Sequence, residues 1–164
     1  MKARLLGLTL AAGLATSAAA HHAGEVVSAG DLHVGHAWTY EVAAMAHAVD
    51  VYLTIDNEGD APDRLIAASV DFADTIEIQA PVVEDGVLKT ATVQAVEIAP
   101  GQTLTFQPGG VHLVLQSVQR AFEHGQHFDL ALTFEKAGTV EVEVEIEELE
   151  HEDEHEQEGA KPAA

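Results

Sequence analysis

Histidine can take part in more kinds of chemistry than any other residue type in this chain, and one histidine lies within a run that has the pattern of a strand. The stretch GGVHLVLQS, residues 109–117, places His112 among apolar neighbours. Because side chains two apart in a strand point the same way, the flanking apolar residues predict a buried face, and His112 shares the other face with Val114. An imidazole there is either a metal ligand or an ordinary polar residue at the edge of a sheet.

A second pair of potential ligands lies in the segment AAMAHA. Met45 and His47 are two residues apart, in the loop expected before a strand at 49–55. Met45 is the only methionine besides the initiator, so it carries the one thioether available to a soft ion. The alternative is that Met45 packs on the rim of the fold while His47 is solvated.

Both ends of the chain carry further histidines. Removal of residues 1–20 would leave His21 and His22 at a new N-terminus, where amine and imidazole nitrogens suit Cu(II) or Ni(II). Near the C-terminus, His151 and His155 are four apart among glutamates, so on a helix they would share a face and bind zinc or copper loosely. The alternative for both pairs is a solvated segment without a ligand role.

Charge and composition restrict the function classes. The chain has 28 Asp and Glu against 7 Lys and Arg, a formal net charge of -21, which disfavours nucleic acid and anionic lipid as partners and attracts cations or basic proteins. Cysteine is absent, which excludes thiolate chemistry. No nucleophile triad, carboxylate pair or phosphate-cradling glycine loop stands out. The sequence therefore predicts a binding protein and not an enzyme.

The first twenty residues, MKARLLGLTLAAGLATSAAA, have the pattern of a cleaved secretory signal, with a basic start, an apolar run and a small-residue end. We therefore expect export to the periplasm and no membrane insertion after cleavage. Residues 21–30 are expected to be a flexible N-terminal segment. Residues 147–164 are almost entirely charged or small, so we expect a disordered acidic tail there.

The elements that must position these side chains are predicted to be strands. Apolar and polar residues alternate with period two at 49–55, 76–78, 128–134 and 140–146, and Gly- and Pro-containing turns separate the runs. Short strands at this spacing, without a long helical period between them, predict an all-β domain over residues 31–146 that folds as an antiparallel β-sandwich.

Several stretches resemble the PCu(A)C family of periplasmic copper chaperones, in matching order and spacing. They are HAW at 36–38, VYLTIDNEGDAPDRLIAAS at 51–69, DTIEIQ at 74–79, EDGVLK at 84–89, PGGVHLVL at 108–115 and LALTFEKAGTVEVEV at 130–144. The resemblance implies a cupredoxin-like β-sandwich with Greek-key connections and a copper-binding function.

The family's copper motif, a histidine, ten residues, a methionine, twenty-one residues and then His-x-Met, can be laid on this chain without a gap. Its positions fall on Gln79, Thr90, His112 and Val114, so only His112 keeps a ligand side chain. Because Cu(I) prefers thioether and imidazole donors, loss of both methionines predicts that the family's Cu(I) site is not intact.

From this resemblance we expect a periplasmic copper chaperone that delivers copper by ligand exchange to an acceptor such as cytochrome oxidase or its assembly factors. His112 would be the retained ligand, completed by Met45, His47 or the terminal histidines. Two alternatives stay open: a copper or zinc buffer that acts through the acidic tail, and an interaction module without metal. The chain is expected to be a monomer or a weak dimer.

Overall fold

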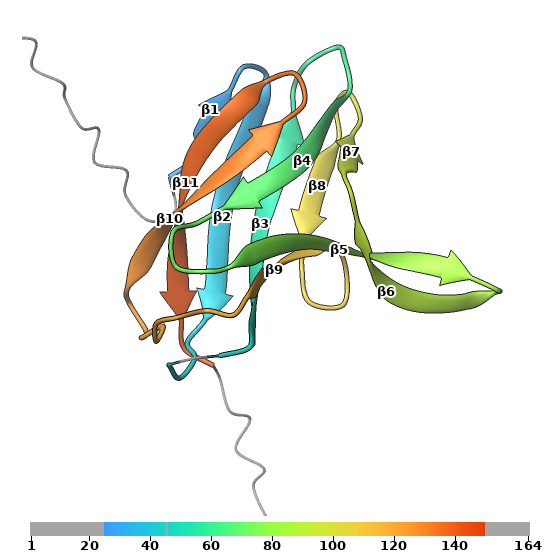
Figure 1. Ribbon diagram of the computed structural model, residues 1–164. Helices are drawn as coiled ribbons and strands as arrows, with labels where there is room; N and C mark the ends of the chain where they lie inside the picture. Colours follow the sequence, from blue (N-terminus) through green and yellow to red (C-terminus); the bar gives the residue numbers. More distant parts are fainter. Residues whose placement is uncertain (1–24, 45, 150–164) are drawn as a thin grey trace, which may run out of the picture.

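The computed structural model describes residues 25–44 and 46–149, and every regular element within them is a β-strand (Figure 1). The all-β fold predicted from the alternating pattern is therefore confirmed. The strands are β1 (Val27–Ala29), β2 (Leu32–Tyr40), β3 (Ala48–Asn57), β4 (Asp63–Ser69), β5 (Thr75–Glu84), β6 (Val87–Val93), β7 (Val96–Ile98), β8 (Thr103–Phe106), β9 (His112–Gln116), β10 (His127–Phe134) and β11 (Gly138–Glu147).

The strands form one continuous sheet with the order β6-β5-β9-β3-β2-β11-β10-β4-β7. β1 pairs with β2 outside this path, and β3 pairs with β9 along its first half and with β8 along its second half. All pairs are antiparallel except β2 with β11, which run parallel, so the sheet is mixed. Figure 1 shows the sheet curling so that β4 and β5 lie in front of β2 and β3.

The core fills the inside of this curled sheet and follows the period-two pattern of the sequence. In β3 the side chains of Val51, Leu53 and Ile55 are at most 1% exposed. β9 adds Leu113 and Leu115, which are fully buried in the same cluster. Each fully buried branched side chain contributes about 1.5–3 kcal/mol to folding. Burial of these side chains therefore fixes which residues of β3 and β9 face inward and which face outward.

A β-bulge in β2 changes which side chains face outward. The pairing with β3 shifts between Gly35 and Trp38, and His36 adopts the left-handed conformation at φ 48°. One extra residue in a strand reverses the facing of every side chain after it. Ala37 and Thr39 therefore turn into the interior and are buried, while Trp38 points to the outer face.

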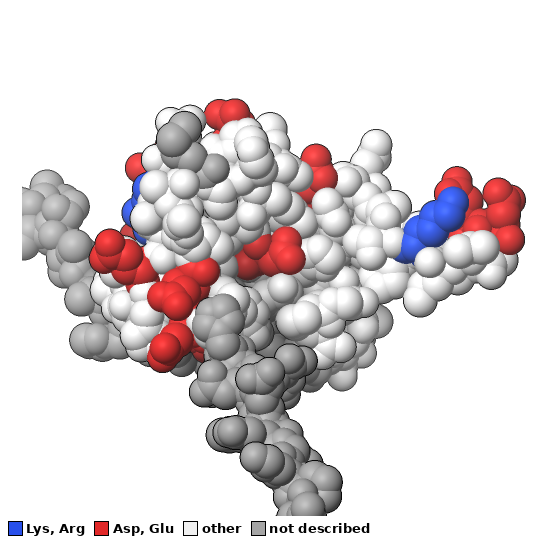
Figure 2. Space-filling view, turned by 90° about the horizontal axis from the view of Figure 1, so that it is seen from below, with Lys and Arg blue, Asp and Glu red and all other residues white. Residues whose placement is uncertain are grey.

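The β5–β6 hairpin projects away from the rest of the molecule (Figure 1). Its tip exposes apolar side chains, with Val83 72% and Leu88 70% exposed, and carries an ion pair between Lys89 Nζ and Glu84 Oε2 at 3.1 Å. Figure 2 shows this tip standing clear of the body, with acidic and basic side chains side by side. The hairpin supplies part of the outer face that holds the family ligand positions.

The boundaries of the domain differ slightly from those expected. β1 lies within the segment 21–30, because Val27 and Ala29 pair with β2 and Ala29 is buried in the core. β11 runs to Glu147, which pairs with Tyr40 of β2. The expected signal segment and residues 150–164 lie outside the described residues. Among the described residues, no helix is long and apolar enough to span a bilayer.

Candidate metal site

The sheet register brings the four family ligand positions onto one face. Gln79 of β5 lies directly opposite His112 of β9. Val114 is opposite Glu77, in the neighbouring row of the same strand pair. Thr90 of β6 is opposite Pro81, two residues beyond Gln79 and so on the same side of the sheet. The motif spacing in the sequence thus corresponds to one local surface, the outer face of β6, β5 and β9.

His112 is held in an orientation suited to coordination. Its Nδ1 lies 2.9 Å from the carbonyl oxygen of Gly110, two residues earlier in the chain. Because a carbonyl only accepts, Nδ1 carries the hydrogen and the neutral ring keeps its lone pair on Nε2. Metal-bound histidines are commonly oriented by this kind of backbone contact. The half-buried His112 ring can therefore offer Nε2 to an ion.

Aromatic side chains extend the face beyond His112. The Tyr52 ring lies 6.4 Å from the His112 ring, and Trp38 lies 4.5 Å from Tyr52. Burial, together with the charge and hydrogen bond of Asp50, raises the pKa of Tyr52 to about 12. Tyr52 is therefore a neutral phenol at physiological pH, and its hydroxyl donates a hydrogen bond to Asp50 at 3.4 Å. Its ring forms one side of the site, and the phenol does not act as an anionic ligand.

Glu77 places a carboxylate beside Gln79 on this face. Its Oε2 accepts hydrogen bonds from Thr92 Oγ1 at 2.9 Å and from Gln79 Nε2 at 3.2 Å. These two donors lower the pKa of Glu77, so the group stays ionised well into mildly acidic solution. Because the amide of Gln79 donates through Nε2, its carbonyl oxygen is left available as an acceptor.

The donor set differs from that of a Cu(I) site. Thr90 is exposed and offers only a hydroxyl. Val114 is 4% exposed and offers only hydrocarbon, although it faces outward and lies outside the core cluster. Besides the His112 imidazole, the same face offers the amide oxygen of Gln79 and the carboxylate of Glu77, donor types that suit a harder divalent ion better than Cu(I). Among the described residues no group of three or more His, Cys, Asp or Glu is arranged to hold a metal ion.

His47 and His112 lie at opposite ends of β9, so the strand register does not bring His47 to His112, and a ligand role for His47 stays a prediction. The carbonyl of His47 accepts a hydrogen bond from the backbone N–H of Ser117 at 2.8 Å, just past the last residue of β9. Ser117 is five residue steps along the chain from His112, roughly 16 Å at 3.3 Å per residue. The physical reason is the antiparallel pairing, which places the loop before β3 beside the far end of β9.

The other sequence-based candidates lie outside the described residues. They are Met45, His21, His22, His151 and His155. Their metal-binding roles stay predictions.

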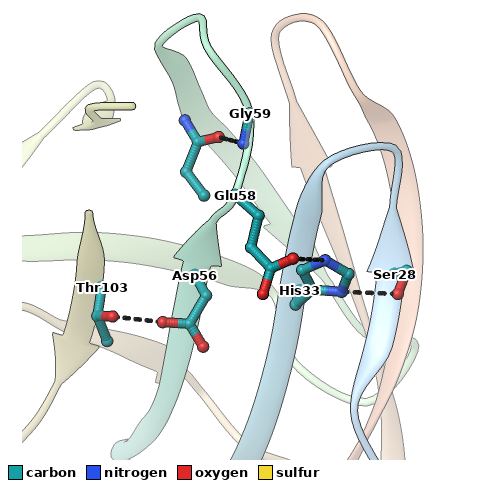
Figure 3. A network of polar contacts seen from close by, with 7 residues as sticks. Ser28, His33, Asp56, Glu58, Gly59 and Thr103 are labelled. Carbon is teal, nitrogen blue, oxygen red and sulfur yellow. Dashed lines mark hydrogen bonds and ion pairs between the residues drawn. The ribbon is translucent and has the colours of Figure 1, made fainter. Parts of the chain in front are cut away.

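A separate polar network occupies the other half of β3 (Figure 3). His33 contacts Glu58 through Nε2 at 3.3 Å and Ser28 through Nδ1 at 2.9 Å, so both of its ring nitrogens already have partners. Asp56, opposite His33, accepts a hydrogen bond from Thr103. These contacts tie β1, β2, β3 and β8 together and give His33 a structural role.

Sequence reasoning singled out His112 but missed its neighbours Glu77, Tyr52 and Trp38. The alternation in TIEIQ already places Glu77 and Gln79 on one face. The cross-strand contacts to His112 could not be derived that way, because they depend on the pairing of β5 and β3 with β9. Trp38 additionally depends on the bulge at His36.

The fold and this face together define a PCuAC-type domain. The chain matches the family model described as "Putative lipoprotein LpqE-like" over residues 32–146. The chain therefore belongs to the LpqE-like family, within the wider PCuAC group that the sequence resemblance indicated.

Solved structures support the fold. The apo PCuAC domain from PmoF1 is 28% identical, with a TM-score of 0.66 over 76% of this chain and 100% of that chain. The copper-bound PCuAC domain from PmoF2 is 22% identical, with a TM-score of 0.66 over 76% of this chain and 99% of that one. Apo-DR1885 from Deinococcus radiodurans is 24% identical, with a TM-score of 0.55 over 91% and 97%. A search of the curated proteins found no match.

Proposed function

We propose that this chain is an extracytoplasmic copper carrier that binds the cupric ion on the outer face of β5 and β9. The observation that carries the proposal is His112, which retains the family ligand position with its Nδ1 hydrogen-bonded to Gly110. This contact leaves Nε2 as the coordinating atom. The fold shared with a copper-bound PCuAC domain supports copper as the cargo.

Oxygen donors near His112 favour Cu(II) over Cu(I). Gln79 lies opposite His112, and the ionised Glu77 is two residues away on the same face. Imidazole, carboxylate and amide oxygens with water match the coordination preference of Cu(II), and zinc accepts the same donors. No thioether is available at the two family methionine positions, Thr90 and Val114, to select the cuprous ion.

Transfer would proceed by ligand exchange. An ion held by one firm ligand at a partly exposed face is under-coordinated, so an acceptor protein with more donors can take it over. We propose an acceptor such as cytochrome oxidase or one of its assembly factors. The net negative charge of the chain, with acidic side chains visible as separate red patches in Figure 2, favours a basic acceptor face.

An extracytoplasmic location, specifically the periplasm, is part of the proposal. It is supported by the signal-like pattern of residues 1–20 and by the lipoprotein description of the family. The 164 residues contain no cysteine, so within them no thiol is available for lipid attachment.

Calorimetric titration of the processed chain with Cu(II), Cu(I) and Zn(II) tests the proposal. We expect Cu(II) to bind more tightly than Cu(I), and His112→Ala to weaken the Cu(II) site at least about tenfold. His127→Ala is the matched control, because His127 is an exposed histidine paired with Glu143 on a different part of the sheet. Equal losses in the two variants, or no loss in either, would refute the assignment.

A metal-free interaction module is the second candidate function. It is favoured by Gln79, Thr90 and Val114, which leave three of the four family positions without the family's ligand. This alternative predicts that Cu(II) and Zn(II) leave the melting temperature unchanged, because only a ligand that binds the folded state raises it.

Removal of residues 150–164 tests the buffer alternative, since a buffer would lose most of its copper capacity with the tail.

A further inference from the structure

A cavity of about 490 Å³ lies apart from the candidate metal site, and none of its lining residues belongs to that site. Its floor is a cross-strand row in which Ala131 of β10 stands between Ser69 of β4 and Glu141 of β11. The small Ala131 side chain leaves the row hollow at its centre. The volume falls within the range of about 300–1,000 Å³ that is usual for small-molecule sites.

Arg120 supplies the one cation in the cavity wall. Its guanidinium carbon lies 4.2 Å from the centre of the Phe72 ring and 5.5 Å from that of Phe128, contacts that are attractive through the aromatic faces. Its Nε is buried without a hydrogen-bond partner, and no carboxylate of the described residues forms an ion pair with it. The guanidinium is therefore desolvated on one side and lacks a matching anion.

The backbone on both sides of Arg120 is fixed. The N–H of Gln119 donates to the carbonyl of Phe72 at 3.1 Å, and Phe122 exchanges two backbone hydrogen bonds with Val42 at 3.0 Å. The Arg120 side chain thus starts from a rigid segment and stacks on a rigid aromatic wall. A planar fork held in place is suited to bidentate binding of a carboxylate.

Three carboxylates line the same cavity: Asp71 from the loop after β4, Asp129 from β10 and Glu141 from β11. With one cation against three anions, the wall as a whole repels a simple anion. It complements a ligand that carries one carboxylate and more than one ammonium group. Val70 and Ala131 in the lining offer an apolar surface for the methylenes between those charges.

We propose that this cavity binds a free basic α-amino acid. The ligand carboxylate is held by the Arg120 fork, its ammonium groups lie against Asp71, Asp129 and Glu141, and its methylene chain lies over Val70 and Ala131. This function is independent of copper binding at His112. The chain then has a second ligand besides copper, a small zwitterion with a net positive charge.

Titration of the processed chain with three matched compounds tests the proposal. L-lysine carries all the groups, cadaverine is lysine without the carboxylate, and 6-aminohexanoate is lysine without the α-ammonium. We expect lysine to bind at least about tenfold more tightly than either, because each lacks one charge-assisted contact. Equal binding of lysine and cadaverine, or no binding of lysine, would overturn the proposal.

Substitution of Arg120 tests whether its guanidinium is the group that binds the carboxylate of the ligand. Arg120→Gln is expected to abolish the preference for lysine over cadaverine, and Arg120→Lys, which keeps the charge without the fork, to reduce it. The second variant gives the answer if the first does not fold. Arg64→Gln is the matched control, because Arg64 is an arginine outside the cavity that pairs with Glu135 at 3.9 Å. A preference unchanged in both Arg120 variants would refute the assignment, and His112→Ala is expected to leave lysine binding intact.

Discussion

Gln79 and His112 lie directly opposite one another on β5 and β9, at the two positions where the family motif has histidines. Opposed residues on antiparallel strands hold their Cβ atoms about 4.5–5.5 Å apart, close enough for both side chains to reach one ion. In this chain an amide faces the imidazole. The geometry of a two-histidine site is therefore preserved while its second nitrogen donor and both sulfur donors are missing.

Restoring the missing donors should restore Cu(I) binding. We expect the triple variant Gln79→His, Thr90→Met, Val114→Met to bind Cu(I) at least about a hundredfold more tightly than the native chain, because three soft or borderline donors join His112 on the same face. Competition with a chromophoric Cu(I) chelator measures the change.

Gln79→His alone is the control for this variant, since it adds a nitrogen without sulfur. Val114 is buried, so a methionine there is expected to cost about 1–3 kcal/mol of stability, and urea denaturation checks that the variant is folded. Native-like Cu(I) affinity in a folded triple variant would show that the four positions do not form one site.

The raised pKa of Tyr52 predicts that the folded protein loses stability at alkaline pH. Its pKa of about 12 in the folded protein lies above the ordinary 10.0, so the neutral phenol contributes its full stabilisation below pH 10.0 and loses it as the pH rises toward 12. Asp50→Asn should lower the pKa, because it removes the adjacent charge while burial remains. Ultraviolet titration of tyrosinate absorbance tests this, and a Tyr52 transition near pH 10.0 would contradict it.

Asp63 at the start of β4 should stabilise the fold in a pH-dependent manner. Burial alone would raise its pKa, but hydrogen bonds from the backbone N–H groups of Arg64, Lys136 and Ala137 outweigh burial and lower it. A lowered pKa stabilises the folded state above the ordinary value of 3.8, and this contribution is lost as the pH falls through the folded value.

Asp63→Asn is therefore expected to cost about 1–3 kcal/mol at neutral pH and less in acid, since the amide cannot replace a charged acceptor of three donors. Urea denaturation at pH 7 and at pH 3 measures both values. A variant equally destabilised at the two pH values would argue for a packing effect without a role for the charge.

Leucines at the hairpin tip and in the core should respond differently to truncation. Leu88 is 70% exposed on β6, so Leu88→Ala should change stability by less than about 0.5 kcal/mol. Leu115 is fully buried in β9, and Leu115→Ala should cost about 2–5 kcal/mol. Thermal unfolding of both variants compares them directly. A large loss for Leu88→Ala would mean that the tip packs against something in solution.

The sequence predicted the strands well where one face is buried. The run expected at 128–134 is β10, His127–Phe134, and the run at 140–146 lies within β11, Gly138–Glu147. Alternation was sufficient because core side chains such as Leu130 and Val144 impose the phase. The same logic placed His112 correctly on the outer face.

Cross-strand relationships could not be derived from alternation. The parallel pairing of β2 with β11 and the opposite ends occupied by His47 and His112 both depend on how distant strands align. The bulge at His36 is a local change of phase that no period reveals in advance. Tyr52 is buried at 5% although its position alternates outward, because Trp38 and His112 pack around its ring.

Copper is expected on the outer face of β5 and β9, and paramagnetic broadening reports where on the chain the ion binds. Cu(II) added well below one equivalent to the isotope-labelled, processed chain broadens the nuclear magnetic resonance signals of residues near the bound ion. We predict that signals of His112, Gln79 and Glu77 broaden first and that His112→Ala removes this effect. Broadening confined to His47 or to the terminal histidines, with the signal of His112 unchanged, would contradict the account.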